Sequence, residues 1–377
     1  WTPIQTQQPA HCSRNPLLYV KGENMAKDKV TIQDIADALH LSRTTVSKAL
    51  NGAPNMPAKT ISAVWNKAKE MNYKQFAYLQ PQNISGNTVP PKKGGTFALL
   101  ANFIPEHFHI ASAIMASLES EISSYGYSLT IHMINTGDIR SLLLPLNFKL
   151  EQVDAILGIE IFDKEYSKML CALGKPVLFF DSFCHSAAEP LSANILLMES
   201  KNSIFRMLHH VLSHENVKRI GFIGDYMHCI SFHERYEGYC NALKFHNLPY
   251  EECYCITQND LLFQAPDFLK IELGKMQSLP DMFCCANDLL AWRTISALRS
   301  LGKKVPQDIL ICGFDDTLIL NSLDSELTTV TTPSREMGIA AAHILLNRVE
   351  NPSLAPMTAY LNSTVQIRSS THKEQRV

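Results

Sequence analysis

The sequence predicts an α/β protein in which a small all-α head precedes a larger core of parallel sheets flanked by helices. Two observations carry this prediction. Residues 30–73 contain three short stretches with helical apolar periodicity, and from Thr96 onward short apolar runs alternate with helical stretches. A segment rich in Asn, Ser, Pro and Gly separates the two parts, which is the composition of a flexible linker. A chain of 377 residues is long enough for two or three domains.

The first predicted helix has one apolar face. Its residues recur at the i, i+3, i+4 and i+7 spacing and are Ile32, Ile35, Ala36 and Leu39. Thr31 is placed to cap the N-terminus, with Asp34 three residues further on. We expect this helix to end at His40 and Leu41.

The second predicted helix has an apolar side and a polar side, and the polar side carries no carboxylate. Ser42 is its expected N-cap. The apolar side is formed by Val46, Ala49 and Leu50, and the polar side by Arg43, Thr44, Ser47 and Lys48, with Thr45 at its edge. Asn51 and Gly52 are expected to end the helix, because these residues tolerate a left-handed backbone.

A third helix is expected from about Pro57, where proline suits a first turn. Its buried residues should be Ile61, Val64, Trp65 and Ala68. Three short helices with a tight turn between the first two describe a helix-turn-helix.

The chemistry of the head suits double-stranded DNA. Residues 25–82 hold eight basic and four acidic residues, a net charge of +4, whereas the whole chain has −2. A helix with a polar, cationic exposed side can enter the major groove and read guanine through Arg, while nearby cations meet phosphates. The expected DNA-binding residues are Thr31, Ser42, Arg43, Thr44, Thr45, Ser47, Lys48 and Asn51. The alternative is an ordinary three-helix packing module with solvated lysines.

The remainder of the chain predicts two sheets with helices on both faces. Its apolar runs are TFALLANF, YSLTIHMI, AILGIEIF, PVLFFDSF, RIGFIGDY, MFCCAND and ILICGFDD. They alternate with helical stretches at 110–125, 163–173, 198–214, 234–247, 288–301 and 334–349. Buried strands with intervening helices predict parallel sheets, and this region is too long for one sheet of that kind. Two lobes facing each other would form a cleft at the carboxyl ends of their strands.

Charged residues at strand ends are candidates for holding a polar ligand in such a cleft. Asp181, Asp288, Asp315 and Asp316 each follow an apolar run, and Arg235 lies at the start of a helix. An arginine with an aspartate across a cleft suits hydrogen bonding to sugar hydroxyls or to a carboxylate. For each aspartate the alternative is a cap on the following helix, and we assign Asp315 and Asp316 a mainly structural role.

Composition and motifs exclude several other classes. A hydrophobic content of 46% with 19% charged residues is ordinary for a globular protein. The ten cysteines contain no Cys-x-x-Cys, so we expect reduced thiols and no metal, and we expect no cofactor. The sequence has no G-x-G-x-x-G, no Walker loop and no G-x-S-x-G elbow, so we expect no enzymatic activity and no catalytic residues. Apolar runs stay below the roughly 18 residues of a membrane span, which predicts a cytoplasmic protein with no membrane partner.

The chain resembles the lactose-repressor/galactose-repressor (LacI/GalR) family of bacterial transcription regulators. The resemblance begins with TIQDIADALHLSRTTVSKALNG and continues in order through KRIGFIGD, HERYEGYCNAL, FCCANDLLAWRTISALRSLGKKVPQDILICGFDD and LTTVTTPSREMGIAAAHILL. It covers nearly everything from residue 29 to about 368. It implies a core similar to periplasmic sugar-binding proteins and a repressor whose operator affinity is controlled by a small effector, expected to be a sugar or sugar derivative.

The resemblance also implies site residues and assembly. Family positions that contact the effector match Arg235, Asp288 and Asp181. Relatives present an aromatic ring after the first strand, where this chain offers Phe103, His107, Phe108 and His109. A homodimer is implied, and the C-terminus has no leucine heptads for a tetramer coil.

The expected domain boundaries follow from these patterns. Residues 1–24 are assigned to a leader or non-native segment, 28–80 to the head, 81–94 to the linker and 95–370 to the core. The resemblance places lobe 1 at about 95–182 and 322–350, and lobe 2 at about 190–315 and 356–370. The three crossings between lobes would lie near 182–192, 315–322 and 351–358.

Two questions stay open at this stage. Relatives carry Tyr-x-Pro-Asn and a leucine that wedges into the minor groove, but this chain lacks the Pro-Asn pair after Tyr73. An apolar wedge could come from Phe76, Tyr78 or Leu79, or this segment could pack on the third helix. The alternative to a regulator is an α/β enzyme or a sugar-binding protein with an accessory helical domain.

Overall fold

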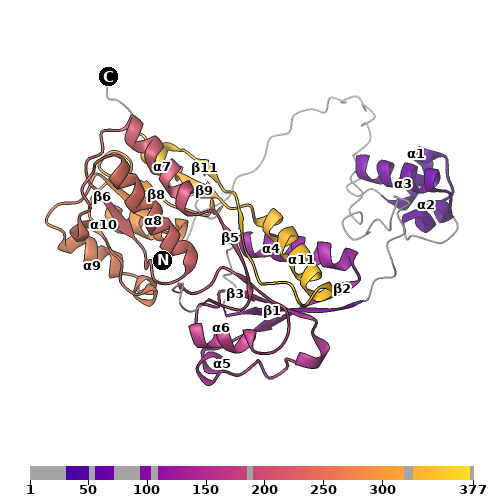
Figure 1. Cartoon of the computed structure of the whole chain (residues 1–377). Helices are drawn as coiled ribbons and strands as arrows, with labels where there is room; N and C mark the ends of the chain where they lie inside the picture. The colour runs from indigo at the N-terminus through magenta and orange to yellow at the C-terminus, as the bar shows by residue number, and fades with distance from the viewer. Residues whose placement is uncertain are drawn as a thin grey trace, which may run out of the picture. The chain divides into compact units, whose positions relative to one another are not determined.

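A computed structural model of the chain describes residues 31–50, 56–71, 94–102, 109–184, 190–317 and 326–373. The chain divides into two compact units, Trp1–Pro90 and Pro91–Val377, which are described separately below (Figure 1). Some predictions concern residues outside the described ranges: the segment 1–24, Asn51, the wedge candidates Phe76, Tyr78 and Leu79, the linker before Gly94, and Phe103, His107 and Phe108. The side chains of Trp65 and His109 also lie outside the description.

The first unit contains the three predicted helices. They are α1 (Ile32–Leu39), α2 (Arg43–Leu50) and α3 (Ala58–Glu70). Their shared core is formed by Ile35, Ala36, Val46, Ala49, Leu50, Val64 and Ala68. Thr31 and Asp34 form a capping box at the start of α1, and His40 ends that helix in the left-handed conformation with φ 53°. The prediction of a helical head is therefore confirmed, including both ends of α1.

The second unit is built on two parallel sheets, and we call the larger sheet with its helices lobe 1. Its strand order is β10-β5-β4-β3-β1-β2. The strands are β1 (Gly95–Ala101), β2 (Tyr127–Met133), β3 (Ala155–Ile159), β4 (Val177–Phe180), β5 (Asn194–Met198) and β10 (Thr358–Leu361). Every neighbouring pair in this sheet is parallel.

Helices cover both faces of the lobe 1 sheet (Figure 1). One face packs against α4 (His109–Ser124) and α11 (Ser334–Glu350), and the other against α5 (Thr136–Ser141) and α6 (Lys164–Cys171). The helices α4 and α11 approach closely at Gly338, where an added Cβ would collide with Ser117 Oγ and the Ile114 carbonyl. The absence of a side chain at this position therefore allows the two helices to pack.

Lobe 2 is built on a three-stranded parallel sheet of order β6-β7-β8. Its strands are β6 (Ile220–Ile223), β7 (Met282–Cys285) and β8 (Leu310–Cys312). Its helices are α7 (Lys201–His214), α8 (Ile230–Phe245), α9 (Phe268–Lys275) and α10 (Asp288–Ser300). An antiparallel pair, β9 (Thr329–Thr331) and β11 (Thr364–Gln366), packs on the same core. The prediction of parallel sheets flanked by helices is confirmed.

The connections between the lobes lie later in the chain than predicted. Because β5 pairs with β4 and β10 pairs with β5, both strands belong to the sheet of lobe 1. The chain therefore crosses after Met198, after Thr331 and after Leu361. This corrects the crossings expected near 182–192, 315–322 and 351–358.

The physical reason for this difference is long-range pairing at the edge of the sheet. Asn194 donates a side-chain hydrogen bond of 3.3 Å to the Val177 carbonyl and accepts one of 3.1 Å from the Met357 amide. The Ile195 amide also donates to the Met357 carbonyl. Segments more than 150 residues apart thus form adjacent strands, which local apolar patterning does not reveal.

Three further findings concern the described residues only. The cysteines among them are free thiols. They contain no group of three or more His, Cys, Asp or Glu side chains arranged to hold a metal ion, and His209, His210 and His214 are exposed on α7. No helix in the described part of the chain is long and apolar enough to cross a membrane.

Candidate functional site

The second helix of the head presents the predicted polar surface. Arg43, Thr44 and Lys48 are exposed, and Thr45 and Ser47 are half-buried at its edge. The first turn contains no acidic residue. The opposite side of α2 is buried through Val46, Ala49 and Leu50, so packing determines which side chains face outward.

Three of the expected DNA-binding residues also shape the helix ends. Ser42 Oγ accepts a hydrogen bond of 3.0 Å from the Thr45 amide, and the hydroxyls of Ser42 and Thr45 lie 2.8 Å apart. The Asp34 amide donates a bond of 3.3 Å to Thr31 Oγ1, and the Thr31 amide donates to Asp34 Oδ2 at 2.8 Å. These bonds satisfy the first amides of α1 and α2, so Thr31, Ser42 and Thr45 have a structural role whatever else they contact.

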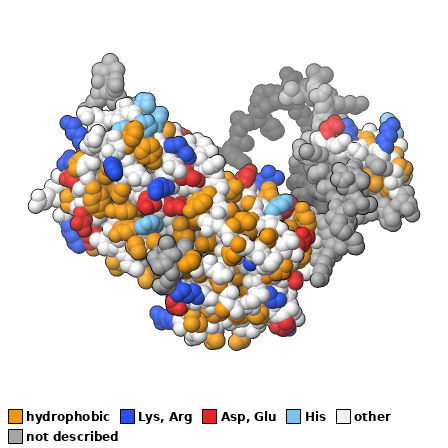
Figure 2. Space-filling view, in the orientation of Figure 1, with side chains coloured by type: hydrophobic (Ala, Val, Ile, Leu, Met, Phe, Trp, Pro, Cys, Tyr) orange, Lys and Arg blue, Asp and Glu red, His pale blue; other side chains and the backbone are white. Residues whose placement is uncertain are grey.

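The charge distribution of the core differs from that of α2. Figure 2 shows charged side chains of both signs interspersed over the visible face of the described core. The described residues on that face form no continuous basic surface. A phosphate backbone is therefore better matched by the head, which has the net positive charge.

Arg235 lies between the lobes, and its side chain is almost completely buried, with 2% of its surface exposed. Its Nη1 donates to the Ala286 carbonyl at 2.7 Å, and its guanidinium carbon lies 3.8 Å from the centre of the Phe314 ring. Its Nη2 lies 3.5 Å from Asp315 Oδ1. No described residue accepts a hydrogen bond from its Nε. Packing thus holds a planar cation in place while leaving part of its donor capacity unused.

Asp315, rather than Asp288, is the acidic partner of Arg235. Asp288 is buried, with 1% of its surface exposed. One of its carboxylate oxygens accepts a hydrogen bond of 2.6 Å from the Thr329 hydroxyl, and the other accepts one of 2.9 Å from the Thr317 amide. Asp288 therefore ties together loops of lobe 2, and its predicted contact with an effector stays a prediction. The backbone of Asp315 has φ 114°, which turns its side chain toward Arg235.

Asp316 has the structural role that the sequence predicted. It accepts a bond of 2.7 Å from Arg368 and another of 2.7 Å from the Thr331 hydroxyl. These partners lie beside and within the β9–β11 pair, so Asp316 anchors that pair to the end of the lobe 2 sheet.

Asp181 joins the two lobes. Its Oδ2 accepts a bond of 2.5 Å from the Ser231 hydroxyl, and its Oδ1 accepts from the amides of Ser182 and Ser231. Ser231 lies in the first turn of α8, so Asp181 of lobe 1 caps a helix of lobe 2. The Ile230 amide donates a parallel bond of 2.9 Å to the Ser182 carbonyl.

Glu160 is a cleft residue that the sequence reasoning missed. It follows β3 with φ 56°, and burial together with the negative charges of Asp181 and Asp315 raises its pKa to about 7. Burial likewise raises the pKa of Asp315 to about 6, against the opposing effect of Arg235. The rule that selected Asp181, an acidic residue directly after an apolar run, also applies to Glu160 in AILGIEIF.

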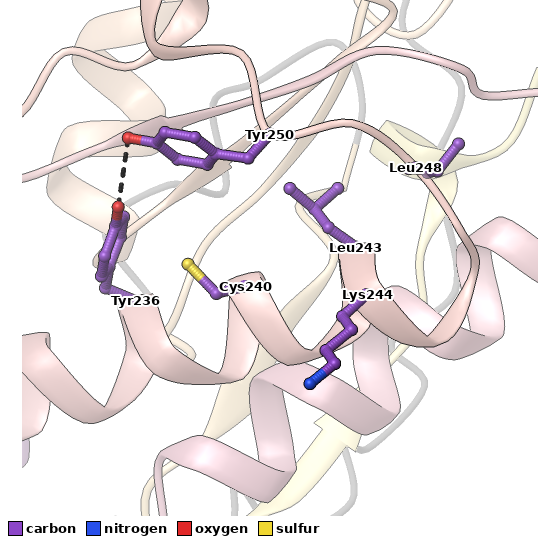
Figure 3. A pocket seen from close by; sticks show the side chains of 6 residues that line it. All are labelled: Tyr236, Cys240, Leu243, Lys244, Leu248 and Tyr250. Atoms are coloured by element: carbon purple, nitrogen blue, oxygen red, sulfur yellow. Dashed lines mark hydrogen bonds between the residues drawn. The ribbon is translucent and has the colours of Figure 1, made fainter.

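A cavity of about 450 Å³ lies on another side of α8 (Figure 3). Its lining comes from α8 and the loop that follows it, and the hydroxyls of Tyr236 and Tyr250 at one end are bonded to each other at 3.1 Å. Neither Arg235 nor Asp315 lines it. We therefore place the candidate ligand site at Arg235, not in this cavity.

Comparisons with known proteins agree with both parts of the chain. A model of the periplasmic binding protein-like domain matches residues 209–371. The HTH-type transcriptional regulator DegA of Bacillus subtilis (strain 168) is 28% identical over 319 residues, covering 82% of this chain and 88% of DegA. The HTH-type transcriptional repressor PurR of Aliivibrio salmonicida is 25% identical and covers 91% of this chain and 99% of PurR.

Solved structures show the same fold. A complex of the transcriptional regulator CelR with cellobiose aligns with a TM-score of 0.64 at 20% identity, covering 91% of this chain and 100% of CelR. The lac repressor dimer, bound to operator and an anti-inducer, aligns with a TM-score of 0.60 at 20% identity, covering 91% of this chain and 99% of the repressor.

Proposed function

The chain belongs to the LacI/GalR family of bacterial transcriptional regulators, and we propose that it is a repressor whose affinity for its operator is set by a small ligand held between its two lobes. It is a DNA-binding regulator and not an enzyme. The observation that carries the proposal is the presence in one chain of an exposed, acid-free reading surface on α2 and a buried arginine–aspartate pair between two lobes.

In the proposed complex α2 lies in the major groove. Arg43 and Thr44, in its first turn, meet base edges, and Lys48 meets the phosphate backbone. Thr31, Ser42 and Thr45 position the helices through their capping hydrogen bonds, and Ser47 lies beside the groove wall. Asn51 completes the proposed set, although it lies outside the described residues.

The proposed assembly is a homodimer that places two copies of α2 in successive major grooves. Half-sites are then spaced by one helical turn of about 34 Å. Apolar side chains suited to an interface are exposed in both lobes: Ile131 and Met133 on the edge strand β2 are 51% and 52% exposed, and Leu261 is 71% exposed. Such residues are costly to leave in water, and a second copy of the chain would cover them. We place this assembly in the cytoplasm, where the DNA is.

The proposed ligand is a sugar or sugar derivative. Arg235, Asp315 and Glu160 supply donors and acceptors suited to hydroxyl groups. Asp181 takes part by exchanging its bond to Ser231 for a bond to the ligand when the lobes move. Asp288 is expected to contact the ligand directly, and we propose that it also holds the loop that carries Asp315. Solved relatives with cellobiose and with ribose support this ligand class.

Ligand binding can change DNA affinity only if the ligand prefers one arrangement of the lobes. In the proposed mechanism the ligand alters the contacts at Asp181 and Ser231, and lobe 1, which follows the head and linker in the sequence, moves with them. The separation of the two α2 helices in the dimer then changes, and so does operator affinity.

Selection from a random duplex pool tests the DNA-binding half of the proposal. The chain, at fixed salt concentration, should enrich a sequence with two-fold symmetry. A chain carrying Arg43→Ala, selected in parallel, should lose preference at one base pair in each half-site. If no sequence is enriched, and the chain shows only non-specific DNA binding that weakens as the salt concentration rises, the proposal is contradicted.

A further inference from the structure

A second cavity lies between the lobes, close to the point where the chain crosses after Met198. Its volume is about 360 Å³. Its apolar wall is formed by Ile195 and Leu197 of β5 together with Ile230 of α8. Lobe 1 and lobe 2 both contribute to its lining, so a molecule bound there would touch both lobes.

This cavity is distinct from the site around Arg235. None of Arg235, Asp315, Asp288 and Glu160 lines it. The two are separated by the start of α8: the Ile230 side chain lines the cavity, while its amide donates to Ser182 and the next residue holds Asp181.

The polar lining of the cavity comes mainly from α8. His233, Glu234 and Glu237 face it from that helix, and Tyr360 faces it from β10. The Tyr360 hydroxyl donates a hydrogen bond of 2.7 Å to Glu234 Oε1 across the boundary between the lobes. His233 Nδ1 is buried and has no hydrogen-bond partner among the described residues.

The carboxylates around the cavity are not equally neutralised. Glu237 pairs with Lys201 at 3.1 Å, and Glu199 pairs with Arg206 at 3.5 Å. Glu234 forms no ion pair with a described residue, and its hydrogen-bond partner there is the neutral hydroxyl of Tyr360. Burial and the negative charges of Asp181, Glu199 and Glu237 raise the pKa of Glu234, as expected for a carboxylate without a counter-ion.

We propose that this cavity is a second binding site and that it takes a small organic cation, a primary amine on an apolar body. The ammonium group would donate to Glu234 and supply the positive charge that the described lining residues lack. The apolar body would lie against Ile195, Leu197 and Ile230, and His233 Nδ1 would gain a partner. Because the ligand bridges β10 and α8, its binding favours the arrangement in which the lobes touch.

Calorimetric titration of the full chain with phenethylamine tests this proposal. Phenethylamine has an ammonium group on a small aromatic body, and 2-phenylethanol is its neutral counterpart. A ligand of this size should bind with a Kd of about 1 mM. The neutral alcohol should bind about tenfold more weakly or worse, because it carries no positive charge to form an ion pair with Glu234.

Variants locate the bound amine. Glu234→Gln should weaken phenethylamine binding by about tenfold, because the glutamine carbonyl forms no ion pair with the ammonium group. Thr358→Trp provides a second test that keeps Glu234. Thr358 is exposed on the edge strand β10, and tryptophan is well tolerated in strands, so the fold should persist. The tryptophan side chain would fill the cavity and abolish phenethylamine binding. Glu252→Gln removes an exposed carboxylate elsewhere in lobe 2 and should leave binding unchanged.

The contrary outcomes are equally specific. Absence of saturable phenethylamine binding, equal binding of the neutral alcohol, or unchanged binding by both Glu234→Gln and Thr358→Trp would each overturn the proposal. Loss of binding in Glu160→Gln with retention in Glu234→Gln would also overturn it, because the amine would then occupy the Arg235 site. Operator selection does not depend on this cavity, so failure here leaves the proposed function standing.

Discussion

The Ser231 hydroxyl in lobe 2 donates a hydrogen bond of 2.5 Å to the carboxylate of Asp181 in lobe 1. The two residues are 50 positions apart, and the bond spans the cleft at the start of the helix that carries Arg235. The main-chain bond from Ile230 to Ser182 runs beside it. A movement that separates the lobes at this point therefore has to break these contacts.

Ser231→Ala should destabilise the core, because Asp181 Oδ2 loses its donor while staying in the same surroundings. We expect the free energy of unfolding to fall by about 1–3 kcal/mol in urea denaturation. Ser296→Ala is the matched control: among the described residues this exposed serine bonds only to the Trp292 carbonyl of its own helix, and its removal should cost less than about 0.5 kcal/mol. Equal stability of the wild type and Ser231→Ala would contradict the contact.

Arg43→Ala should remove discrimination at one base pair of each half-site, at a cost of about 1–3 kcal/mol measured by fluorescence anisotropy on the selected operator. Affinity for random DNA should change little. Lys59→Ala in α3 is the control, because it removes an exposed cation of the same unit outside α2. Should Arg43→Ala weaken operator and random DNA equally, Arg43 would be a phosphate contact and not a base reader.

Glu160→Gln should change how stability depends on pH. The pKa of Glu160 is raised from its ordinary value of 4.5 to about 7, so the folded state binds a proton more tightly than the unfolded state. The protonated carboxyl stabilises the fold fully below 4.5, and this contribution is lost as pH rises through 7. The variant should therefore gain stability relative to wild type, by about 1 kcal/mol or more, between about pH 5 and about pH 8.

Urea denaturation at several pH values measures this difference. Glu252→Gln, which alters an exposed carboxylate, should follow the wild-type profile. A constant difference between Glu160→Gln and wild type at every pH would show that Glu160 ionises normally in the folded protein.

Gly338→Ala should lower the free energy of unfolding by about 1–3 kcal/mol, because the added methyl group collides with α4 and forces the two helices apart. Gly274 lies in α9 with open space around its Cα, so Gly274→Ala should instead be neutral or stabilise by up to about 1 kcal/mol. Thermal denaturation of both variants measures the contrast. Similar effects of the two substitutions would mean that α4 and α11 do not pack closely at Gly338.

Local patterns predicted the head well, because its helices are specified by residues within a few positions of one another. The spacing of Ile32, Ile35, Ala36 and Leu39, with the Thr31–Asp34 capping box, defines α1 without reference to distant residues. The parallel core was predicted for the same reason, since each buried strand is a short apolar run. The positions of β5 and β10 were not predicted, because their place in the sheet depends on pairing between segments far apart in the chain.

The geometry around Arg235 could be predicted only in part, and its role in ligand binding stays a prediction. Arg235 was identified and lies between the lobes, but which aspartate faces it depends on backbone conformation. Asp315 turns toward Arg235 through its positive φ, whereas Asp288 is held by Thr317 and Thr329. Sequence spacing places both residues at strand ends and does not distinguish these two orientations.

Operator affinity measured with and without a panel of sugars, for wild type and for Arg235→Lys, tests the central claim most directly. The lysine keeps the positive charge but lacks the planar fork that Ala286 and Asp315 hold. At fixed salt concentration, at least one sugar should change wild-type operator affinity by about tenfold, a coupling of about 1.4 kcal/mol, while Arg235→Lys binds the operator normally and responds weakly or not at all. An equal response in the two proteins would remove Arg235 from the ligand site, and no response of wild type to any sugar would contradict a carbohydrate effector.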